Sequence, residues 1–304
     1  MSEHTIQRIL VIGAGTMGQQ ISLQCATHGL DVTLYDVSEQ ALQRARGTLK
    51  TLAAAMAADL DKSTVEVDEI LDRIQYSNDA AAAAADADLV SESVPEDVWL
   101  KRKVFAQFDK LCPARTIFTT NTSTLLPKEI AQQSDRPDRF AALHFHPDVW
   151  NSNVVDVLPY KAAPPELGEV LRQFSVRIGQ IPILFRKNSR GFIVNRFLVG
   201  IFRQALDMAA SEVASPEEVD AAFTGVLKSQ LGPFAIMDIV GLDTMLSINQ
   251  FWSKRLLHIP KLDPVFRRNM KFLRSYVDKG HLGRKTGKGF YEYPAKDPST
   301  PGDE

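Results

Sequence analysis

The sequence has few cysteines. Its 304 residues include only Cys25 and Cys112, and neither belongs to a CxxC pair. Because a disulfide framework needs several paired cysteines, we expect two reduced thiols in a reducing compartment. The first residues show no signal-peptide pattern. Both observations favour a cytoplasmic protein.

The sequence also lacks an excess of charge and long apolar runs. Lys and Arg number 35 against 37 Asp and Glu, which gives a net charge of −2. A surface that binds polyanions is therefore not expected, and we predict no nucleic-acid partner. No uninterrupted apolar run approaches the roughly 20 residues that a membrane-spanning helix needs, so we predict no membrane association.

What the sequence does contain is an alternation of strand-like and helix-like segments. RILVIGAG (8–15) is a short apolar run that ends in glycines, TMGQQISLQCATHG (16–29) has apolar residues at helical spacing, and DVTLYD (31–36) is again strand-like. A strand, a glycine turn, a helix and a strand make a βαβ unit. Such a unit implies parallel pairing and a right-handed crossover.

The same alternation continues to about residue 187. Further strands are expected at 86–94, 116–123, 140–145, 152–158 and 181–185. Further helices are expected at 38–58, 64–74, 97–111 and 165–178, with a short surface helix over the alanines at 80–85.

After residue 187 the pattern changes to helices alone. A long amphipathic helix is expected at 191–214, and SPEEVDAAFTG (215–225) has the Ser cap, Pro and early Glu of a helix start. We therefore predict an α/β fold in two parts. A Rossmann-type dinucleotide-binding domain covers 1–187, and a smaller all-helical domain covers 188–304.

The turn GAGTMG (13–18) fits the dinucleotide pattern GxGxxG. The pattern alone is weak, but here it follows a predicted strand and opens a predicted helix, as a dinucleotide site requires. Gly13 permits the tight turn, and Gly15 lets the backbone approach a pyrophosphate at the helix N-terminus. Gly18 allows close packing of the helix on the strand.

Asp36 stands at the end of the second predicted strand. A carboxylate there accepts hydrogen bonds from the ribose hydroxyls of adenosine and repels a 2′-phosphate. The next residue is Val37, so no arginine is present to bind that phosphate. The sequence predicts NAD rather than NADP as the cofactor. The alternative for Asp36 is an acid that only caps its own loop.

The stretch LHFHPDVWNSNVVDV (143–157) holds two histidines and two aspartates. An imidazole, with an ordinary pKa of about 6.5, can take a proton from an alcohol while a hydride leaves. A histidine in an apolar strand can also be a plain core residue. On a strand, His144, His146 and Asp148 would share a face and could hold zinc. Pro147 and the dinucleotide motif argue against zinc, and we predict no metal.

Six stretches resemble the 3-hydroxyacyl-CoA dehydrogenase family. They are VIGAGTMGQQIS (11–22), SESVPED (91–97), TNTSTLLPKEIA (120–131), the histidine stretch, GFIVNRFL (191–198) and LGRKTGKGFYEY (282–293). The resemblance covers nearly the whole chain. It implies a Rossmann-type domain, a helical domain that usually mediates dimerisation, and hence a homodimer. It also implies NAD-dependent oxidation of L-3-hydroxyacyl-CoA to 3-ketoacyl-CoA.

The resemblance assigns roles to particular residues. His144 matches the general base, and the carboxylate that orients it falls at position 156. This chain has Asp156 there, where the family usually has Glu. The side chain is shorter by one C–C bond, about 1.5 Å. Either the two backbones lie closer together or a water joins the two groups.

The resemblance also implies further contacts with substrate and cofactor. Ser123 matches a serine near the 3-oxygen of the substrate, and Asn195 matches an asparagine near the substrate carbonyl or the nicotinamide. Glu96 and Lys101 match positions near the nicotinamide ribose and the substrate.

The chain departs from the family at the acyl pocket. It reads HFHPD where HFFNP or HPFNP is common, and Arg190 precedes GF in place of a proline. Two alternatives follow from these changes. The substrate is a small free 3-hydroxy acid, as for the carnitine and gulonate dehydrogenase relatives, with Arg190 and His146 serving its carboxylate. Otherwise the chain is a catalytically weak NAD-binding protein.

Overall fold

A computed structural model describes residues 6–60, 64–255 and 263–294. The chain divides into two compact units, Met1–Phe192 and Ile193–Glu304. The division falls after Phe192, whereas the change of sequence pattern lies near residue 187. The reason is the Phe192 side chain, which is buried in a hydrophobic cluster of the first unit with Leu126 and Leu158.

An eight-stranded sheet forms the centre of the first unit. Its strand order is β3-β2-β1-β4-β5-β6-β7-β8, and every neighbouring pair is parallel except β6 and β7. The strands are β1 (Arg8–Ile12), β2 (Asp31–Tyr35), β3 (Ile74–Ser77), β4 (Leu89–Glu92), β5 (Ile117–Thr120), β6 (Phe140–Phe145), β7 (Val154–Pro159) and β8 (Ile181–Leu184).

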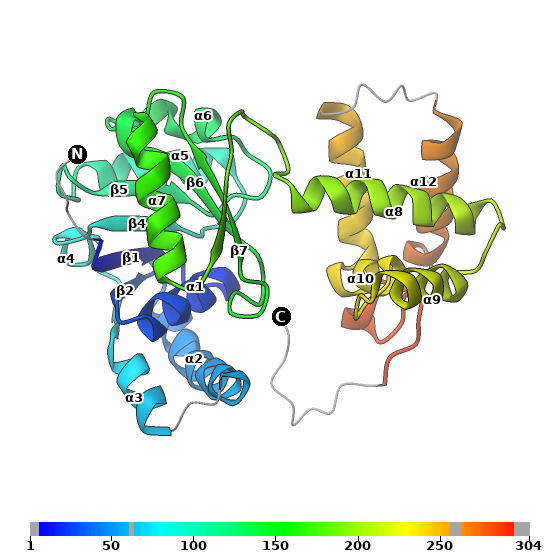
Figure 1. Cartoon of the computed structure of the whole chain (residues 1–304), viewed down its shortest axis with the longest axis horizontal. Helices are drawn as coiled ribbons and strands as arrows, with labels where there is room; N and C mark the ends of the chain where they lie inside the picture. Colours follow the sequence, from blue (N-terminus) through cyan, green and yellow to red (C-terminus); the bar gives the residue numbers. More distant parts are fainter. Residues whose placement is uncertain (1–5, 61–63, 256–262, 295–304) are drawn as a thin grey trace. The chain divides into compact units, whose positions relative to one another are not determined.

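Helices cover both faces of this sheet, as Figure 1 shows for α1 and α7 on one face. Successive strand residues point to opposite faces, so Leu10 and Val11 of β1 belong to two different hydrophobic clusters. The cluster on one face includes α1 (Thr16–Thr27), α2 (Glu39–Asp59), α3 (Thr64–Asp72) and α7 (Pro165–Arg177). The cluster on the other face includes α4 (Ala80–Ala84), α5 (Val98–Asp109) and α6 (Pro127–Ile130).

The strand order creates a switch point beside β1. The chain runs from β1 outward through β2 to β3, and then returns to place β4 on the other side of β1. In open α/β sheets, ligands bind in the crevice at the carboxyl ends of the strands where the order reverses. The glycine turn follows β1 and therefore lies at this point.

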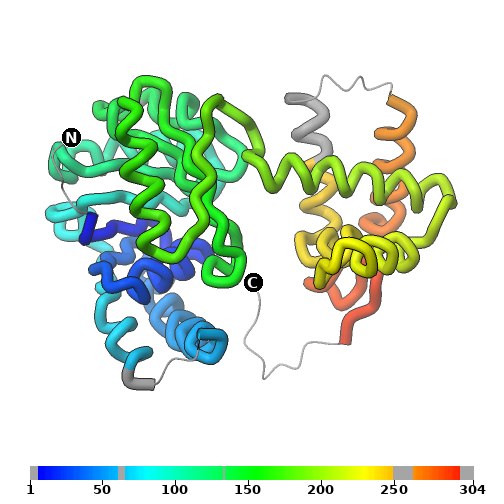
Figure 2. The backbone as a smooth tube through the Cα atoms, in the orientation of Figure 1, coloured from blue at the N-terminus to red at the C-terminus, as the bar shows by residue number. Residues whose placement is uncertain are grey.

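The second unit is helical throughout its regular elements, as predicted. It contains α8 (Val194–Ala210), α9 (Pro216–Leu227), α10 (Pro233–Val240), α11 (Leu242–Arg255) and α12 (Pro264–Val277). Figure 2 traces this unit in green-yellow to red. Its core is a hydrophobic cluster that includes Phe234, Met237 and Leu273. Within the described part of the chain, no helix is long and apolar enough to cross a membrane.

Two details of the first unit differ from the sequence-based prediction. The strand β3 was not predicted, because its four residues are an edge strand with only Ile74 buried and show no clear alternation. The alanine helix α4 exists, but it is not wholly a surface helix. Ala83 and Ala84 are buried in the hydrophobic cluster beside α5.

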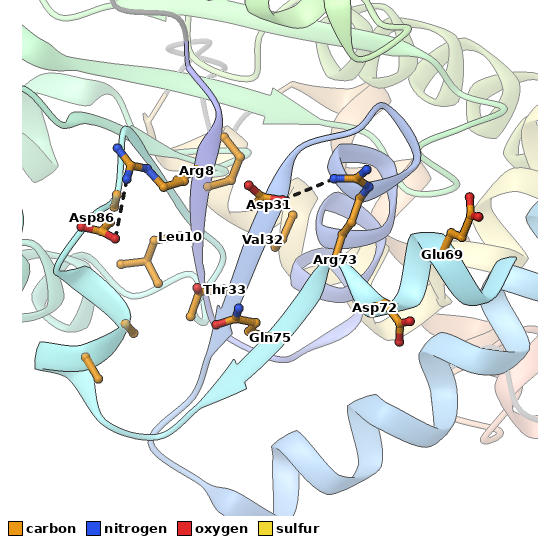
Figure 3. A pocket seen from close by; sticks show the side chains of 14 residues that line it. Arg8, Leu10, Asp31, Val32, Thr33, Glu69, Asp72, Arg73, Gln75 and Asp86 are labelled. Atoms are coloured by element: carbon orange, nitrogen blue, oxygen red, sulfur yellow. Dashed lines mark hydrogen bonds and ion pairs between the residues drawn. The ribbon is translucent and has the colours of Figure 1, made fainter. Parts of the chain in front are cut away.

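A cavity of about 560 Å³ lies at the amino ends of the strands (Figure 3). Its lining includes Arg8 and Asp31, the first residues of β1 and β2. Both of its arginines are paired with acids: Arg8 with Asp86 at 3.6 Å, and Arg73 with Asp31 at 3.4 Å. This cavity lies at the opposite edge from the glycine turn, so it is not the predicted cofactor site.

Candidate active site

The glycine turn has the backbone that a dinucleotide requires. Gly13 has a φ of +107°, and a Cβ there would lie 2.8 Å from the Ser93 carbonyl oxygen. A Cβ on Gly18 would lie 1.8 Å from the Gly13 carbonyl oxygen, so helix and turn pack without room for a side chain. A Cβ on Gly15 would meet nothing within 4 Å. The backbone at Gly15 is thus open to a ligand at the start of α1.

Asp36 holds the turn through both of its carboxylate oxygens. Oδ2 accepts the Ala14 N–H at 2.9 Å, and Oδ1 accepts the Ser38 N–H at 2.9 Å. The loop-capping role considered from the sequence is therefore present. It does not exclude ribose binding, because each carboxylate oxygen has two lone pairs. Val37, beside it, is 82% exposed.

A buried ion pair lies at the end of β4. The Lys101 side chain is only 1% exposed, and its Nζ donates to Glu92 Oε1 at 2.7 Å and to the Val94 carbonyl at 3.1 Å. The same Nζ lies 3.4 Å from Glu96 Oε2. An ammonium has three N–H donors, and three acceptors surround this one. Lys101 therefore positions the two glutamates.

Glu92 was not predicted as a site residue, although it is central to this network. Its other oxygen accepts the Thr120 hydroxyl at 2.6 Å, which ties β4 to β5. Burial raises the pKa of Glu92, and the attraction of Lys101 offsets only part of that rise. A glutamate as the last residue of a buried strand, followed by an amphipathic helix with a lysine on its buried face, is the signal that could have found it.

Glu96 connects the network to the loop that carries Ser123. Its Oε1 accepts the Thr122 hydroxyl at 2.5 Å and the Thr124 N–H at 2.9 Å. Burial works to raise the pKa of Glu96, but Lys101 and these hydrogen bonds hold the pKa below its usual range. Ser123 stands between the two threonines and is partly exposed. Among the described residues, its hydroxyl has no hydrogen-bond partner.

His144 and Asp156 are opposite each other on β6 and β7. The two residues are paired in the antiparallel register, and His144 Nδ1 lies 3.0 Å from Asp156 Oδ2. Directly opposed residues have Cβ atoms about 5 Å apart. The shorter aspartate therefore reaches the imidazole directly, and no bridging water is needed.

Burial favours the neutral form of His144. The residue is 5% exposed, and its ring stacks on Phe192 with centroids 4.8 Å apart. Burial lowers the pKa of His144, and the hydrogen bond to Asp156 recovers only part of the loss, so the pKa lies below 6.5. With Nδ1 on Asp156, Nε2 is the remaining acceptor. Nε2 has no hydrogen-bond partner in the part of the chain that the structure describes.

His146 contacts the same aspartate from the other side. Its Nε2 lies 3.3 Å from Asp156 Oδ2, without hydrogen-bond geometry, and its ring meets that of His144 edge-on at 4.7 Å. Burial works to raise the pKa of Asp156, but the two histidines hold it below its usual range. The acid near both imidazoles is thus Asp156. Asp148 is exposed, has a φ of +63° and bonds to Asn151.

The two remaining residues that were singled out from the sequence, Arg190 and Asn195, belong to different units. Arg190 forms an ion pair with Glu129 at 2.8 Å and bonds to the Thr124 carbonyl at 3.4 Å. It is therefore engaged within the first unit. Asn195 is the second residue of α8 in the second unit and is partly exposed.

Four neighbouring parallel strands bring most of these residues to one edge of the sheet. The strands β1, β4, β5 and β6 lie side by side and run in the same direction. Their carboxyl ends carry, in order, the glycine turn, Glu92, the Ser123 loop and His144. Asn121, on the Ser123 loop, accepts the N–H of Phe145 at 2.8 Å and links that loop to the end of β6.

The buried ion pair makes a prediction about stability. Glu92→Gln leaves the Lys101 ammonium buried with only Glu96 as a charged partner. Losing one member of a buried pair costs roughly 3 kcal/mol, so urea unfolding should begin at clearly lower concentration. Glu69→Gln, on the exposed side of α3, is the matched control and should unfold as the unchanged chain does. Equal unfolding midpoints for both variants would show that the pair does not stabilise the fold.

The two units match the two parts of one protein family. Residues 8–189 match the family described as "3-hydroxyacyl-CoA dehydrogenase, NAD binding domain". Residues 191–293 match "3-hydroxyacyl-CoA dehydrogenase, C-terminal domain". The first match covers the glycine turn and names its cofactor, which confirms the prediction of NAD.

Individual relatives are similar over nearly their whole length. The probable 3-hydroxybutyryl-CoA dehydrogenase of Bacillus subtilis is 34% identical over 301 residues, which cover 96% of this chain and 99% of that protein. A solved diketoreductase is 37% identical with a TM-score of 0.85, over 95% of this chain and 100% of that one. The solved (S)-3-hydroxybutyryl-CoA dehydrogenase of Ralstonia eutropha is 31% identical, with the same TM-score and coverage. This chain therefore belongs to the 3-hydroxyacyl-CoA dehydrogenase family.

Proposed function

We propose that this chain oxidises L-3-hydroxyacyl-CoA to 3-ketoacyl-CoA with NAD, in a reversible reaction. The observation that carries the proposal is the His144–Asp156 pair, with Nδ1 and Oδ2 3.0 Å apart. The pair is buried, and His144 stands at the same edge of the sheet as the glycine turn. A neutral imidazole with a free Nε2 is suited to accept a hydroxyl proton.

Proton transfer and cofactor binding are carried out by different residues. Bound NAD⁺ supplies the hydride acceptor. His144 Nε2 takes the proton of the substrate hydroxyl, and Asp156 stabilises the imidazolium that forms. In the reverse direction the imidazolium returns this proton. The glycine turn and the start of α1 would hold the pyrophosphate, with Asp36 at the adenosine ribose.

The other site residues bind and orient. The hydroxyl of Ser123 would donate to the oxygen whose charge changes. Asn195 would donate to the substrate carbonyl or the nicotinamide, a role supported by its motif. Glu96 would reach the nicotinamide ribose, and Lys101 would act by positioning Glu92 and Glu96, since it donates to Glu92 and forms an ion pair with Glu96.

A second candidate substrate is a small hydroxy or dicarbonyl compound without CoA. The diketoreductase relative, 37% identical, is described as acting on dicarbonyl compounds. A free carboxylate, however, would need a cation. Arg190 is paired with Glu129 at 2.8 Å, and His146 lies against Asp156. Arg190, one of the two groups proposed from the sequence for that task, is therefore already paired, which favours the acyl-CoA substrate.

Two further proposals concern the state of the protein in the cell. The helical unit leaves large apolar side chains exposed, among them Val213 at 72%, Val226 at 77% and Leu227 at 62%. A homodimer formed through this unit would cover them.

We also propose a cytoplasmic location, because Cys25 and Cys112 are both free and buried.

The first prediction from this proposal concerns His144. His144→Ala should bind NADH as the unchanged chain does, because the glycine turn is untouched. Turnover should fall by about a thousandfold, as expected when a general base is lost. NADH fluorescence titration and NADH oxidation, with acetoacetyl-CoA and with free acetoacetate, measure the two effects and also separate the candidate substrates. A variant with near-normal turnover would refute the assignment of the base.

His281→Ala is the matched control for this experiment. His281 lies in the second unit and is partly exposed. Its removal should leave both NADH binding and turnover unchanged.

The second prediction concerns pH. Oxidation needs neutral His144, whose pKa is lowered chiefly by burial. As the pH falls, kcat/KM for oxidation should decline with a midpoint below pH 6.5, as the imidazole gains its proton. Steady-state rates between pH 5 and 8 test this. A decline with its midpoint above 6.5 would contradict the burial of the base.

The third prediction concerns the choice of cofactor. Replacing Asp36 with Ser and Val37 with Arg removes a repulsive carboxylate and adds a cation for the 2′-phosphate. The ratio of kcat/KM for NADPH to that for NADH should rise at least roughly tenfold, equivalent to about 1.4 kcal/mol. Val37→Leu is the control and should keep the original ratio. An unchanged ratio in the double variant would show that Asp36 only caps its loop.

A further inference from the structure

Two buried polar atoms beside the catalytic pair have no hydrogen-bond partner among the described residues. They are Asp156 Oδ1 and His146 Nε2. Asp156 is 0% exposed. Leaving a buried polar atom unpaired costs about 1–3 kcal/mol, and an ion bound between the two histidines and Asp156 would give His146 Nε2 a partner. The proposed hydride transfer uses neither atom.

The arrangement of these groups matches a metal site. His144, His146 and Asp156 each offer one ligand atom, and the three atoms lie within 4.8 Å of one another. Asp156 Oδ2 is 3.0 Å from His144 Nδ1 and 3.3 Å from His146 Nε2. Ligands bound tetrahedrally to zinc at 2.0–2.1 Å are about 3.3 Å apart. The two distances to Asp156 are thus close to those of a zinc site, and the ligand atoms of the two histidines lie within 4.8 Å of each other.

The ligand types select the class of ion. Two imidazoles and one carboxylate, with a fourth position left for water, suit Zn²⁺ and the similar ion Co²⁺. Mg²⁺ prefers oxygen ligands and would bind poorly here. The strand register places His144 opposite Asp156, and Phe192 stacks on the His144 ring, so the first two ligands are held before any ion arrives.

We propose that His144, His146 and Asp156 form an inhibitory site for Zn²⁺. The ion replaces the hydrogen bond between His144 Nδ1 and Asp156. When Nδ1 is a metal ligand, the proton of the neutral imidazole is carried by Nε2. Nε2 then cannot accept the proton of the substrate hydroxyl, so the bound ion blocks oxidation without displacing the cofactor. This consequence for activity rests on the proposed function, whereas binding of the ion does not.

The binding test needs no substrate. The full chain is freed of metal with a chelator and titrated with Co²⁺, whose visible absorption reports tetrahedral coordination, and with Zn²⁺ in a calorimeter. We expect one ion per chain. His146→Phe and His146→Gln should each weaken binding at least tenfold, and His281→Gln should not. Should the Phe variant fail to fold by circular dichroism, the Gln variant decides.

Two results would overturn the site. One is the absence of tetrahedral Co²⁺ absorption with the unchanged chain. The other is binding to the His146 variants as tight as to the unchanged chain, which would place the ion elsewhere.

Activity then tests inhibition separately. Zn²⁺ should inhibit NADH oxidation by the unchanged chain, EDTA should restore it, and His146→Gln should lose this sensitivity relative to its own metal-free rate. If Co²⁺ binds but no acyl-CoA or free acid is turned over, the metal site stands and the proposed function fails. If turnover is normal and Zn²⁺ at saturation leaves it unchanged, the inhibitory role fails.

Discussion

The hydrogen bond between His144 and Asp156 is the contact on which the proposed chemistry depends. It joins β6 to β7 at directly paired positions, with 3.0 Å between Nδ1 and Oδ2. Because the acid occupies Nδ1, the free Nε2 becomes the acceptor. Burial lowers the pKa of the imidazole and so favours the neutral ring, while the aspartate limits that fall and stabilises the ring once it is protonated. Exposing the ring would remove the effect that lowers its pKa, and losing Asp156 would remove the effect that limits this fall.

The rest of the first unit places this pair beside the cofactor. Parallel strands end at a common edge, and β1, β4, β5 and β6 are neighbours. The glycine turn, the Glu92–Lys101 pair, the Ser123 loop and His144 therefore meet without any long excursion of the chain. Side chains then link these ends: Glu92 accepts from Thr120, and Glu96 accepts from Thr122. The site is assembled by strand order first and fixed by buried hydrogen bonds second.

Much of this could be predicted from the sequence, because the signals are local. The strand, the GxGxxG turn and the acid at position 36 follow one another within a single βαβ unit, and the pattern itself carries the geometry. The role of Asp156 needed the resemblance to a family. Contacts between side chains on different strands were harder to predict. Glu92 reads as an ordinary strand residue until Lys101 is seen buried against it. His146 lies just beyond β6, where side chains no longer alternate between the two faces of the sheet. The sequence therefore could not show that His146 contacts Asp156 and not Asp148.

The protonation of the His144 ring is the most direct test of its role as the general base. Nuclear magnetic resonance of chains labelled with ¹⁵N in histidine distinguishes a nitrogen that carries a proton from one that does not, and His144→Gln identifies the signals. At pH 7 we expect a neutral ring that carries its proton on Nδ1, with no proton on Nε2. A ring protonated on Nε2 alone, or doubly protonated at this pH, would contradict it.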